Sequence, residues 1–140
     1  MTMNIAEMPL MTMLKTRMGW LSARQNVLSQ NVANADTPGY AAKDLKPVDF
    51  SAILKDATKP AQFQGGLATT DPRHMSFNPQ TDPDYTSTDS PDVESSPSGN
   101  TVSLEQEMIR VSDTQAEYQA ASNLYAKAMG MMKTAIGHGG

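Results

Sequence analysis

The sequence has no cysteine, and this absence excludes disulfide scaffolds, zinc-thiolate sites and thiol nucleophiles. Aromatic residues are only 6% of its 140 residues and mean hydropathy is -0.46, so apolar surface for a self-sufficient core is scarce. Eleven Lys and Arg against fifteen Asp and Glu give a net charge of -4, which does not favour nucleic-acid binding. No apolar run approaches the roughly 18 residues of a membrane span. We therefore expect one small domain, with no nucleic-acid partner and no direct lipid anchoring.

A cleaved secretory signal is also not expected. Residues 8–14 form a short apolar run, and Ala33-Asn34-Ala35 imitates a cleavage site. However, Glu7 precedes the run where a signal needs positive charge, and three basic residues separate the run from the supposed site. If the chain leaves the cytoplasm, we expect another route to carry it.

Residues able to carry catalysis or hold a metal are few and badly spaced. The two histidines, His74 and His138, have no acidic or histidine partner at metal-ligand spacing. A calcium loop is suggested by four aspartates: Asp82, Asp84, Asp89 and Asp92. However, this loop lacks the sixth-position glycine and the terminal glutamate of a calcium site, and Pro83 interrupts it. Phosphate loops, nucleophile elbows and dinucleotide motifs are also missing. The sequence predicts no catalytic residue, no cofactor and no metal site, and hence no enzyme.

The chain divides into three parts by composition. Seven of nine prolines fall between residues 41 and 100, whereas ten of eleven methionines fall outside that stretch. Because proline interrupts helices, this distribution predicts helical ends and a non-helical middle. We expect an N-terminal helix over residues 1–36 with a turn following to residue 40, an irregular segment over 41–100, and a C-terminal helix over 101–140.

Apolar residues in the N-terminal part alternate three and four positions apart, as in the heptad seam of a coiled coil. The seam comprises Met11, Leu14, Met18, Leu21, Leu28 and Val32, with Gln25 in the remaining position. Pro9 suits the first turn of this helix, where a missing N–H costs nothing. Thr37 precedes a proline and is driven toward extended geometry, so the helix must stop. Pro38-Gly39 then fits the central pair of a type II turn.

The C-terminal part carries stronger helix signals. Ser103-Leu104-Glu105-Gln106 has the pattern of a capping box, in which serine and glutamine side chains satisfy first-turn amides. A seam of alternating spacing follows: Leu104, Met108, Val111, Gln115, Tyr118, Ser122, Tyr125, Met129, Met132 and Ile136. A second apolar strip lies beside it: Leu124, Ala128, Met131 and Ala135. Glycines from Gly137 onward end the helix.

The middle segment offers little to bury. Residues 78–100 contain five acids, no bases and four prolines, so we expect this tract not to fold on its own. Five apolar residues are predicted to form short strands or a small hairpin around Gly65-Gly66: Phe50, Ile53, Leu54, Phe63 and Leu67. The predicted fold class is mainly α, with long terminal helices pairing as a coiled coil and an irregular Pro-rich middle containing at most a small β-hairpin.

Two amphipathic helices leave apolar stripes that need partners. They can pair with each other as a hairpin, or pack in addition on helices of neighbouring subunits. Alanines on the longer helix permit close approach, and a heterologous contact that does not close builds a filament or tube. Gln25, Gln115 and Ser122 would then set the register at some cost in stability.

Residues 31–40, which read Asn-Val-Ala-Asn-Ala-Asp-Thr-Pro-Gly-Tyr, resemble the N-terminal signature of bacterial flagellar rod, hook and hook-associated axial proteins. The C-terminal helix, with Glu107-Met108 early and Tyr118-Gln119-Ala120 in its middle, is similar to the other terminal helix of that family. The matches cover about half the chain. The short members of that family are the flagellar basal-body rod proteins. Among them, the chain is most similar to a proximal rod protein at Arg24-Gln25 and Asp44-Leu45-Lys46-Pro47, and the sister proximal rod protein is the nearest competitor.

The resemblance implies a structural subunit of the proximal rod, located in the periplasmic part of the basal body. Members are exported unfolded through the flagellar type III apparatus without signal-peptide cleavage. Their terminal helices form an inner coiled-coil tube around an export channel, and the assembly transmits torque. The implied partners are other copies of the chain, other rod proteins, the adaptor protein that joins rod to gate, and the export gate.

The resemblance also implies roles for two residue sets. The signature residues are expected to take part in subunit packing where the N-terminal helix ends: Asn31, Asn34, Asp36, Thr37, Pro38, Gly39 and Tyr40. This role is compatible with an ordinary turn that ends a helix. The helix seams are expected to line helix contacts: Leu14, Leu21, Leu28, Met108, Val111, Tyr118, Tyr125, Met132 and Ile136.

The alternative is a helical-hairpin adaptor or secretion chaperone that binds one partner and never polymerises. It explains the heptads equally well and leaves the signature at residues 31–40 unexplained.

Overall fold

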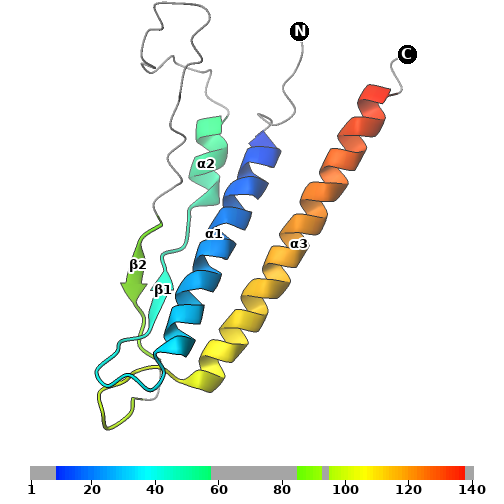
Figure 1. Ribbon diagram of the computed structural model, residues 1–140. Coiled ribbons are helices and arrows are strands. Elements are labelled where there is room, and N and C mark those ends of the chain that lie inside the picture. The colour runs from blue at the N-terminus through cyan, green and yellow to red at the C-terminus, as the bar shows by residue number, and fades with distance from the viewer. Residues whose placement is uncertain (1–8, 58–84, 93–94, 138–140) are drawn as a thin grey trace, which may run out of the picture.

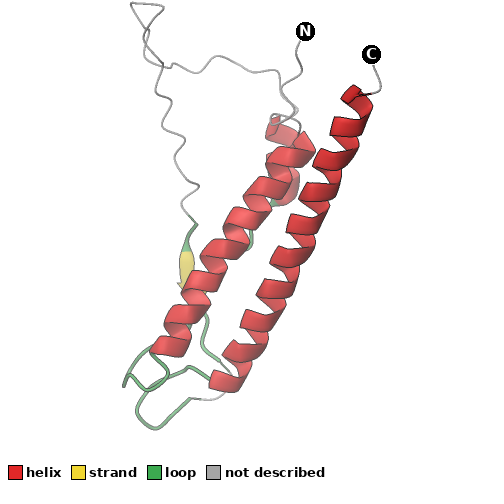
Figure 2. Ribbon diagram, turned by 45° about the vertical axis from the view of Figure 1, so that its right-hand side comes forward, coloured by secondary structure: helices red, strands yellow, loops and turns green. Residues whose placement is uncertain are grey.

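The computed structural model describes residues 9–57, 85–92 and 95–137. Along these residues the elements are α1 (Pro9–Ala33), β1 (Lys43–Leu45), α2 (Phe50–Ala57), β2 (Ser87–Asp89) and α3 (Leu104–Gly137). The long helices α1 and α3 lie side by side, and β1 and α2 lie against the other side of α1 (Figure 1). The turned view in Figure 2 shows the same pairing of the two helices. The predicted mainly helical fold with two terminal helices is confirmed.

Helix α1 is buried along a column of leucines. Leu14, Leu21 and Leu28 are seven residues apart, which is about two helical turns, so they share one face. All three are buried, as is Met11, whereas Met18 and Val32 at the other predicted seam positions are half-buried. Burying these leucines removes apolar surface of α1 from water and so stabilises the fold.

The opposite side of α1 contacts the strand and loop segments. The Trp20 indole Nε1–H donates to the Lys46 carbonyl at 2.9 Å, and Trp20 packs with Leu21, Leu45 and Ala121 in the core. The Tyr85 hydroxyl donates to the Thr16 carbonyl at 3.2 Å. A Cβ atom at Gly19 would lie 3.3 Å from that hydroxyl, so the absent side chain lets Tyr85 approach the helix.

Helix α3 begins where the sequence predicts, but with a different partner at its cap. The Ser103 carbonyl accepts the Glu107 N–H at 2.9 Å. The Ser103 N–H donates to Asp92 Oδ2 at 2.7 Å, so Asp92 occupies the acceptor position that a capping box assigns to Gln106. The distant loop therefore contributes to the start of this helix.

Within the described residues of the middle segment, one part forms a helix. Residues 50–57, expected in strands, form helix α2 instead, since Phe50, Ile53 and Leu54 have helical spacing. Asp49 caps this helix by accepting the Ser51 and Ala52 N–H groups at 3.0 and 3.3 Å. Hydrogen bonds from the Ser51 hydroxyl, then from these amides, lower the Asp49 pKa. Phe63, Leu67 and the expected Gly65-Gly66 hairpin lie outside the described residues.

The observed sheet joins segments far apart in the sequence. Strands β1 and β2 pair antiparallel, with Lys43 opposite Asp89 and Leu45 opposite Ser87. The second strand lies within the polar tract at residues 78–100, which composition predicts not to fold on its own. Residues 85–92 and 95–100 are ordered by partners elsewhere in the chain, through backbone pairing and the buried side chains of Asp92 and Asn100.

Candidate functional site

The signature residues form a turn that closes onto the loop before α3. The Tyr40 N–H donates to the Thr37 carbonyl at 3.3 Å, and Gly39 has φ = 72°, which confirms the predicted type II turn. The Gly39 N–H donates to the Ser98 carbonyl at 3.1 Å. A Cβ atom at Gly99 would lie 3.6 Å from the Gly39 Cα atom, so the two loops are in direct backbone contact.

Asn100 joins this turn to the start of α3. Its Nδ2 donates to the carbonyls of Asn34 and Thr37 at 2.9 and 2.7 Å, just past the C-terminal end of α1. Its Oδ1 accepts the Val102 N–H at 2.8 Å. Asn100 is 2% exposed, and its amide connects the turn after α1 to the residues that lead into α3.

Asn31 is the centre of a buried polar network near the end of α1. Its Nδ2 donates to the Lys43 carbonyl at 2.7 Å and to Glu107 Oε2 at 3.0 Å. Its Oδ1 accepts the Lys43 N–H at 3.0 Å and the Tyr40 hydroxyl at 3.2 Å. One fully buried side chain therefore connects α1, β1, α3 and the signature turn, and it uses every hydrogen-bonding capacity of its amide.

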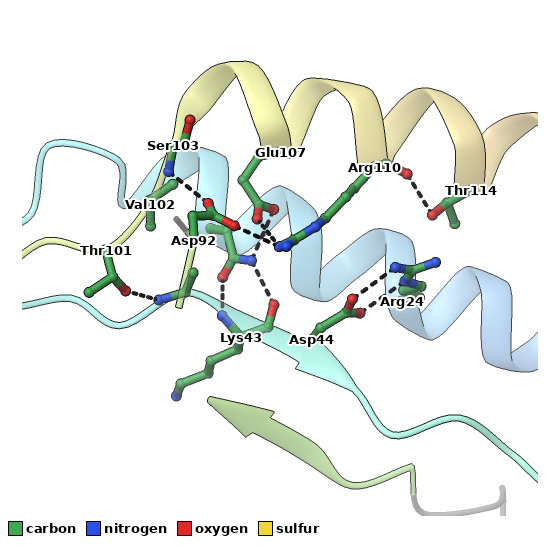
Figure 3. A network of polar contacts seen from close by, with 12 residues as sticks. Arg24, Lys43, Asp44, Asp92, Thr101, Val102, Ser103, Glu107, Arg110 and Thr114 are labelled. Carbon is green, nitrogen blue, oxygen red and sulfur yellow. Dashed lines mark hydrogen bonds and ion pairs between the residues drawn. The ribbon is translucent and has the colours of Figure 1, made fainter. Parts of the chain in front are cut away.

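Two buried carboxylates share one arginine in this network (Figure 3). Arg110 Nη1 lies 2.8 Å from Glu107 Oε1 and 2.9 Å from Asp92 Oδ1. Both carboxylate side chains are fully buried, whereas the Arg110 side chain is 21% exposed. Burial raises the Glu107 pKa, while the hydrogen bond from Asn31 lowers it; the Asp92 charge raises it, and Arg110 lowers it. The site thus places two acids around one base.

A second ion pair fixes β1 to α1. The Arg24 guanidinium binds both oxygens of Asp44, with Nε to Oδ1 at 2.9 Å and Nη2 to Oδ2 at 2.8 Å. The same guanidinium lies 5.5 Å from the centre of the Trp20 ring. The hydrogen bond to Asp44 raises the Arg24 pKa, so this arginine stays charged. This pair holds β1 on the same helix that carries the first residues of the signature.

The signature divides between buried and exposed residues. Asn31 is buried, and Asn34 and Tyr40 are half-buried, so their side chains act within the chain. The four residues at the tip of the turn are exposed: Asp36, Thr37, Pro38 and Gly39. The structure therefore places the signature at the end of α1, with its tip at the surface.

The face of α3 turned toward α1 is not the face that carries the predicted seam. Its buried residues are Glu107, Thr114, Ala121 and Ala128, seven apart, and each precedes a predicted seam position by one residue. Small side chains let the helices approach closely, so the column with two alanines lies against the leucines of α1. The predicted seam therefore does not form the centre of the contact between α1 and α3, and its role in contacts with other subunits stays a prediction.

The large apolar residues of α3 consequently lie outside the contact with α1. Leu104, Met108, Tyr118, Met129 and Ile136 are between 41% and 63% exposed. Val111, Tyr125 and Met132 are half-buried. They occupy two neighbouring heptad columns, 104/111/118/125/132 and 108/115/122/129/136, which we call the outer apolar face. A folded chain rarely exposes so long an apolar stripe unless another molecule covers it.

A groove between α1 and α3 interrupts this face at its middle. It is lined by Leu21, Ser22, Gln25 and Asn26 of α1 and by Thr114, Gln115, Tyr118 and Gln119 of α3. Gln115 and Tyr118 belong to the outer apolar face, so the groove is continuous with it. Among the described residues, no donor bonds the buried Oε1 atom of Gln25.

Sequence reasoning missed three buried polar residues of the network. Asp92 is considered above only as a calcium ligand, Glu107 only as part of a family match, and Asn100 not at all. No local pattern reveals them, because the partners of Asn100 lie 66 and 63 residues earlier. The network arises only when α1 and α3 come together.

In the part of the chain that the structure describes, no helix is long and apolar enough to span a membrane. In the same residues, His, Cys, Asp and Glu side chains do not gather in threes or more that could hold a metal ion. Both histidines, together with Asp82 and Asp84, lie outside the described residues.

Comparisons with known proteins identify the group to which the chain is similar. Residues 16–40 match the family described as "Flagella basal body rod protein". The chain is 36% identical over 117 residues to flagellar basal body rod protein FlgB of Aeromonas hydrophila, covering 83% of this chain and 84% of the relative. It is 35% identical to FlgB of Escherichia coli, with 78% and 80% covered, and 31% identical to FlgB of Bacillus subtilis, with 81% of both covered. The chain therefore belongs to the FlgB family of flagellar basal body rod proteins.

Proposed function

We propose that this chain is a structural subunit of the proximal rod that assembles helically through its terminal helices. The observation that carries the proposal is the outer apolar face of α3. Its large residues, such as Met108 and Ile136, are exposed although another face of the same helix packs on α1. Burying such residues against a neighbouring subunit removes apolar area from water at roughly 25 cal/mol per Å².

The geometry supports contacts between neighbouring helices. In the assembled rod, the outer apolar face of each copy packs on a terminal helix of the next rod subunit, and successive contacts continue around the axis rather than closing in pairs. The helices pack as coiled coils and together line an export channel. Stiff, packed helices also suit a subunit that transmits torque.

The exposed tip of the signature turn supplies a second contact in this proposal. Asp36, Thr37, Pro38 and Gly39 lie at the surface, while Asn31 and Tyr40 anchor the turn from within. A turn held so firmly presents the same shape to each neighbour. The neighbours proposed are further copies, other rod proteins, the adaptor between rod and gate, and the export gate.

The test is a charge placed in the outer apolar face. Tyr118→Asp in the native flagellar system puts a carboxylate where a neighbouring subunit should pack, and we expect loss of swimming and loss of the chain from purified basal bodies. Tyr118 is 41% exposed, so the monomer should still fold. Leu28→Asp is a poorer test, because Leu28 is fully buried and its replacement unfolds the chain.

The matched control is Asn123→Asp, an exposed position of α3 outside both columns of the outer apolar face. It should swim normally. If Tyr118→Asp also assembles and swims like the parent, the outer apolar face is not a subunit contact. Discrete soluble complexes of fixed stoichiometry with one partner, in place of incorporation into basal bodies, would support the adaptor alternative.

A further inference from the structure

The groove at the middle of the outer apolar face has an unusual composition. Column 108/115/122/129/136 begins with Met108 and ends with Met129 and Ile136, but Gln115 and Ser122 stand between them. Across the groove, α1 contributes Gln25 and Asn26. Amide side chains from both helices therefore converge at one level of a stripe that is apolar above and below it.

Gln25 has an atom that the folded chain leaves without a partner. Its Oε1 is buried, and within the described residues no donor bonds it. A buried acceptor without a hydrogen bond is unfavourable, and native proteins contain few of them. Gln25 lines the groove, and because the last torsion of a glutamine side chain is broad, its amide can rotate to meet a donor that enters there.

We propose that this groove sets the register between rod subunits by receiving one amide or hydroxyl side chain from a neighbouring subunit's helix. The neighbour's residue donates to Gln25 Oε1, while apolar residues on either side of it lie along the outer apolar face. This inference rests on the proposed function, because it assumes that a subunit helix covers that face.

The physical reason for such a contact is specificity. An apolar stripe alone allows a neighbouring helix to slide by one heptad with little change in free energy. A polar side chain that finds its partner in only one alignment leaves a buried group unpaired in every other alignment. A subunit that must repeat the same contact many times needs that restriction.

The experiment replaces Gln25 by methionine, which has nearly the same volume and only a weakly accepting sulfur in place of the amide oxygen. Removing the unpaired oxygen should leave the melting temperature of the isolated chain unchanged or raise it. Recovery of the chain in basal bodies should fall about fivefold, the effect of one lost hydrogen bond on an association constant. Gln30→Met, at an exposed position of the same helix outside the groove, is the control and should change neither quantity.

The outcomes separate this inference from the proposed function. Gln25→Met with normal melting and reduced assembly supports the groove, and Gln115→Leu, at an exposed position, should repeat the result. If Gln25→Met assembles like the parent while Tyr118→Asp does not, the subunit contact stands and the register site is wrong. If Gln25→Met lowers both melting temperature and assembly, Gln25 is a residue of the monomer fold and the inference also fails.

Discussion

Glu107 shows how a single residue of this chain takes its properties from distant parts of the sequence. It opens α3, where an acid interacts favourably with the helix dipole. The fold then buries it completely and supplies Asn31 from α1 and Arg110 from α3 as donors. With Asp92 beside the same guanidinium, the site contains one more acid than base. Burial of the carboxylate, together with the Asp92 charge, raises the Glu107 pKa and makes the residue sensitive to pH.

The sign of that dependence follows from the raised Glu107 pKa. The folded chain holds the proton more tightly than the unfolded chain, so this group favours folding most at low pH. Its contribution declines as pH rises from the ordinary pKa of 4.5 through the raised one. We expect the free energy of unfolding of the parent to fall relative to Glu107→Gln as pH increases over this window, measured by urea unfolding at several pH values.

Glu105 provides the control for this prediction. It is an exposed acid in the same helical turn, so Glu105→Gln should give no comparable change relative to the parent. A parent that instead gains stability over Glu107→Gln with rising pH would mean that the Arg110 and Asn31 interactions outweigh burial at this carboxylate.

At the scale of the elements, the ends of the two long helices depend on loops that lie far away in the sequence. The end of α1 is completed by Asn100, and the start of α3 by Asp92. These loops meet where Gly39 and Gly99 are in contact, and both glycines have positive φ values of 72° and 82°. The turn geometry therefore controls how α1 and α3 are joined.

Two glycine substitutions test this difference between turn and helix. Gly39→Ala forces a side chain into left-handed backbone geometry and should lower the free energy of unfolding by about 1 kcal/mol. Gly130→Ala, within α3 and with open space around it, should raise it by about 0.5–1 kcal/mol. Thermal or urea unfolding of both variants measures these two changes in the free energy of unfolding. Equal effects would contradict the role of the signature turn as a constrained joint.

At the scale of the whole molecule, the two long helices differ in how much of their surface the rest of the chain covers: α1 is covered on two sides and α3 on one side. The described contacts of α1 involve α3 on one side and β1 and α2 on the other, whereas α3 packs mainly on α1 (Figure 1). Many of the large apolar residues left exposed belong to the outer apolar face, and Ile109, Leu124 and Met131 of α3 are exposed beside it. Under the proposed function, the longest helix of the monomer is completed by association with a neighbouring subunit.

Association should make the stability of the chain depend on its concentration. Binding between folded copies stabilises the folded state by mass action, so the melting temperature should rise by about 2–4 °C for each tenfold increase in concentration. Tyr118→Asp, which disrupts the outer apolar face, should remove this dependence, whereas Asn123→Asp should retain it. Circular dichroism at several concentrations measures the effect, and a melting temperature independent of concentration in the parent would argue against self-association through α3.

The sequence was sufficient wherever local pattern governs structure. Heptad spacing predicted both long helices, Thr37-Pro38-Gly39-Tyr40 predicted the type II turn, and Ser103 marked the start of α3. The signature at residues 31–40 led to the rod proteins, in agreement with the comparisons. Each of these signals depends on neighbours in the chain and on the geometry of one or two turns.

Only the tertiary structure decided which face of α3 lies against α1 and which polar groups are buried. Leucine size on α1 selects small partners, so Thr114, Ala121 and Ala128 face inward, whereas the larger Met129, one position after Ala128, is exposed. Burial of Asp92, Asn100 and Glu107 becomes favourable only when their partners from distant segments surround them, because a buried polar group must be hydrogen-bonded. Spacing along one helix determines that a stripe exists, and the volume and hydrogen bonds of the packed neighbours determine where it points.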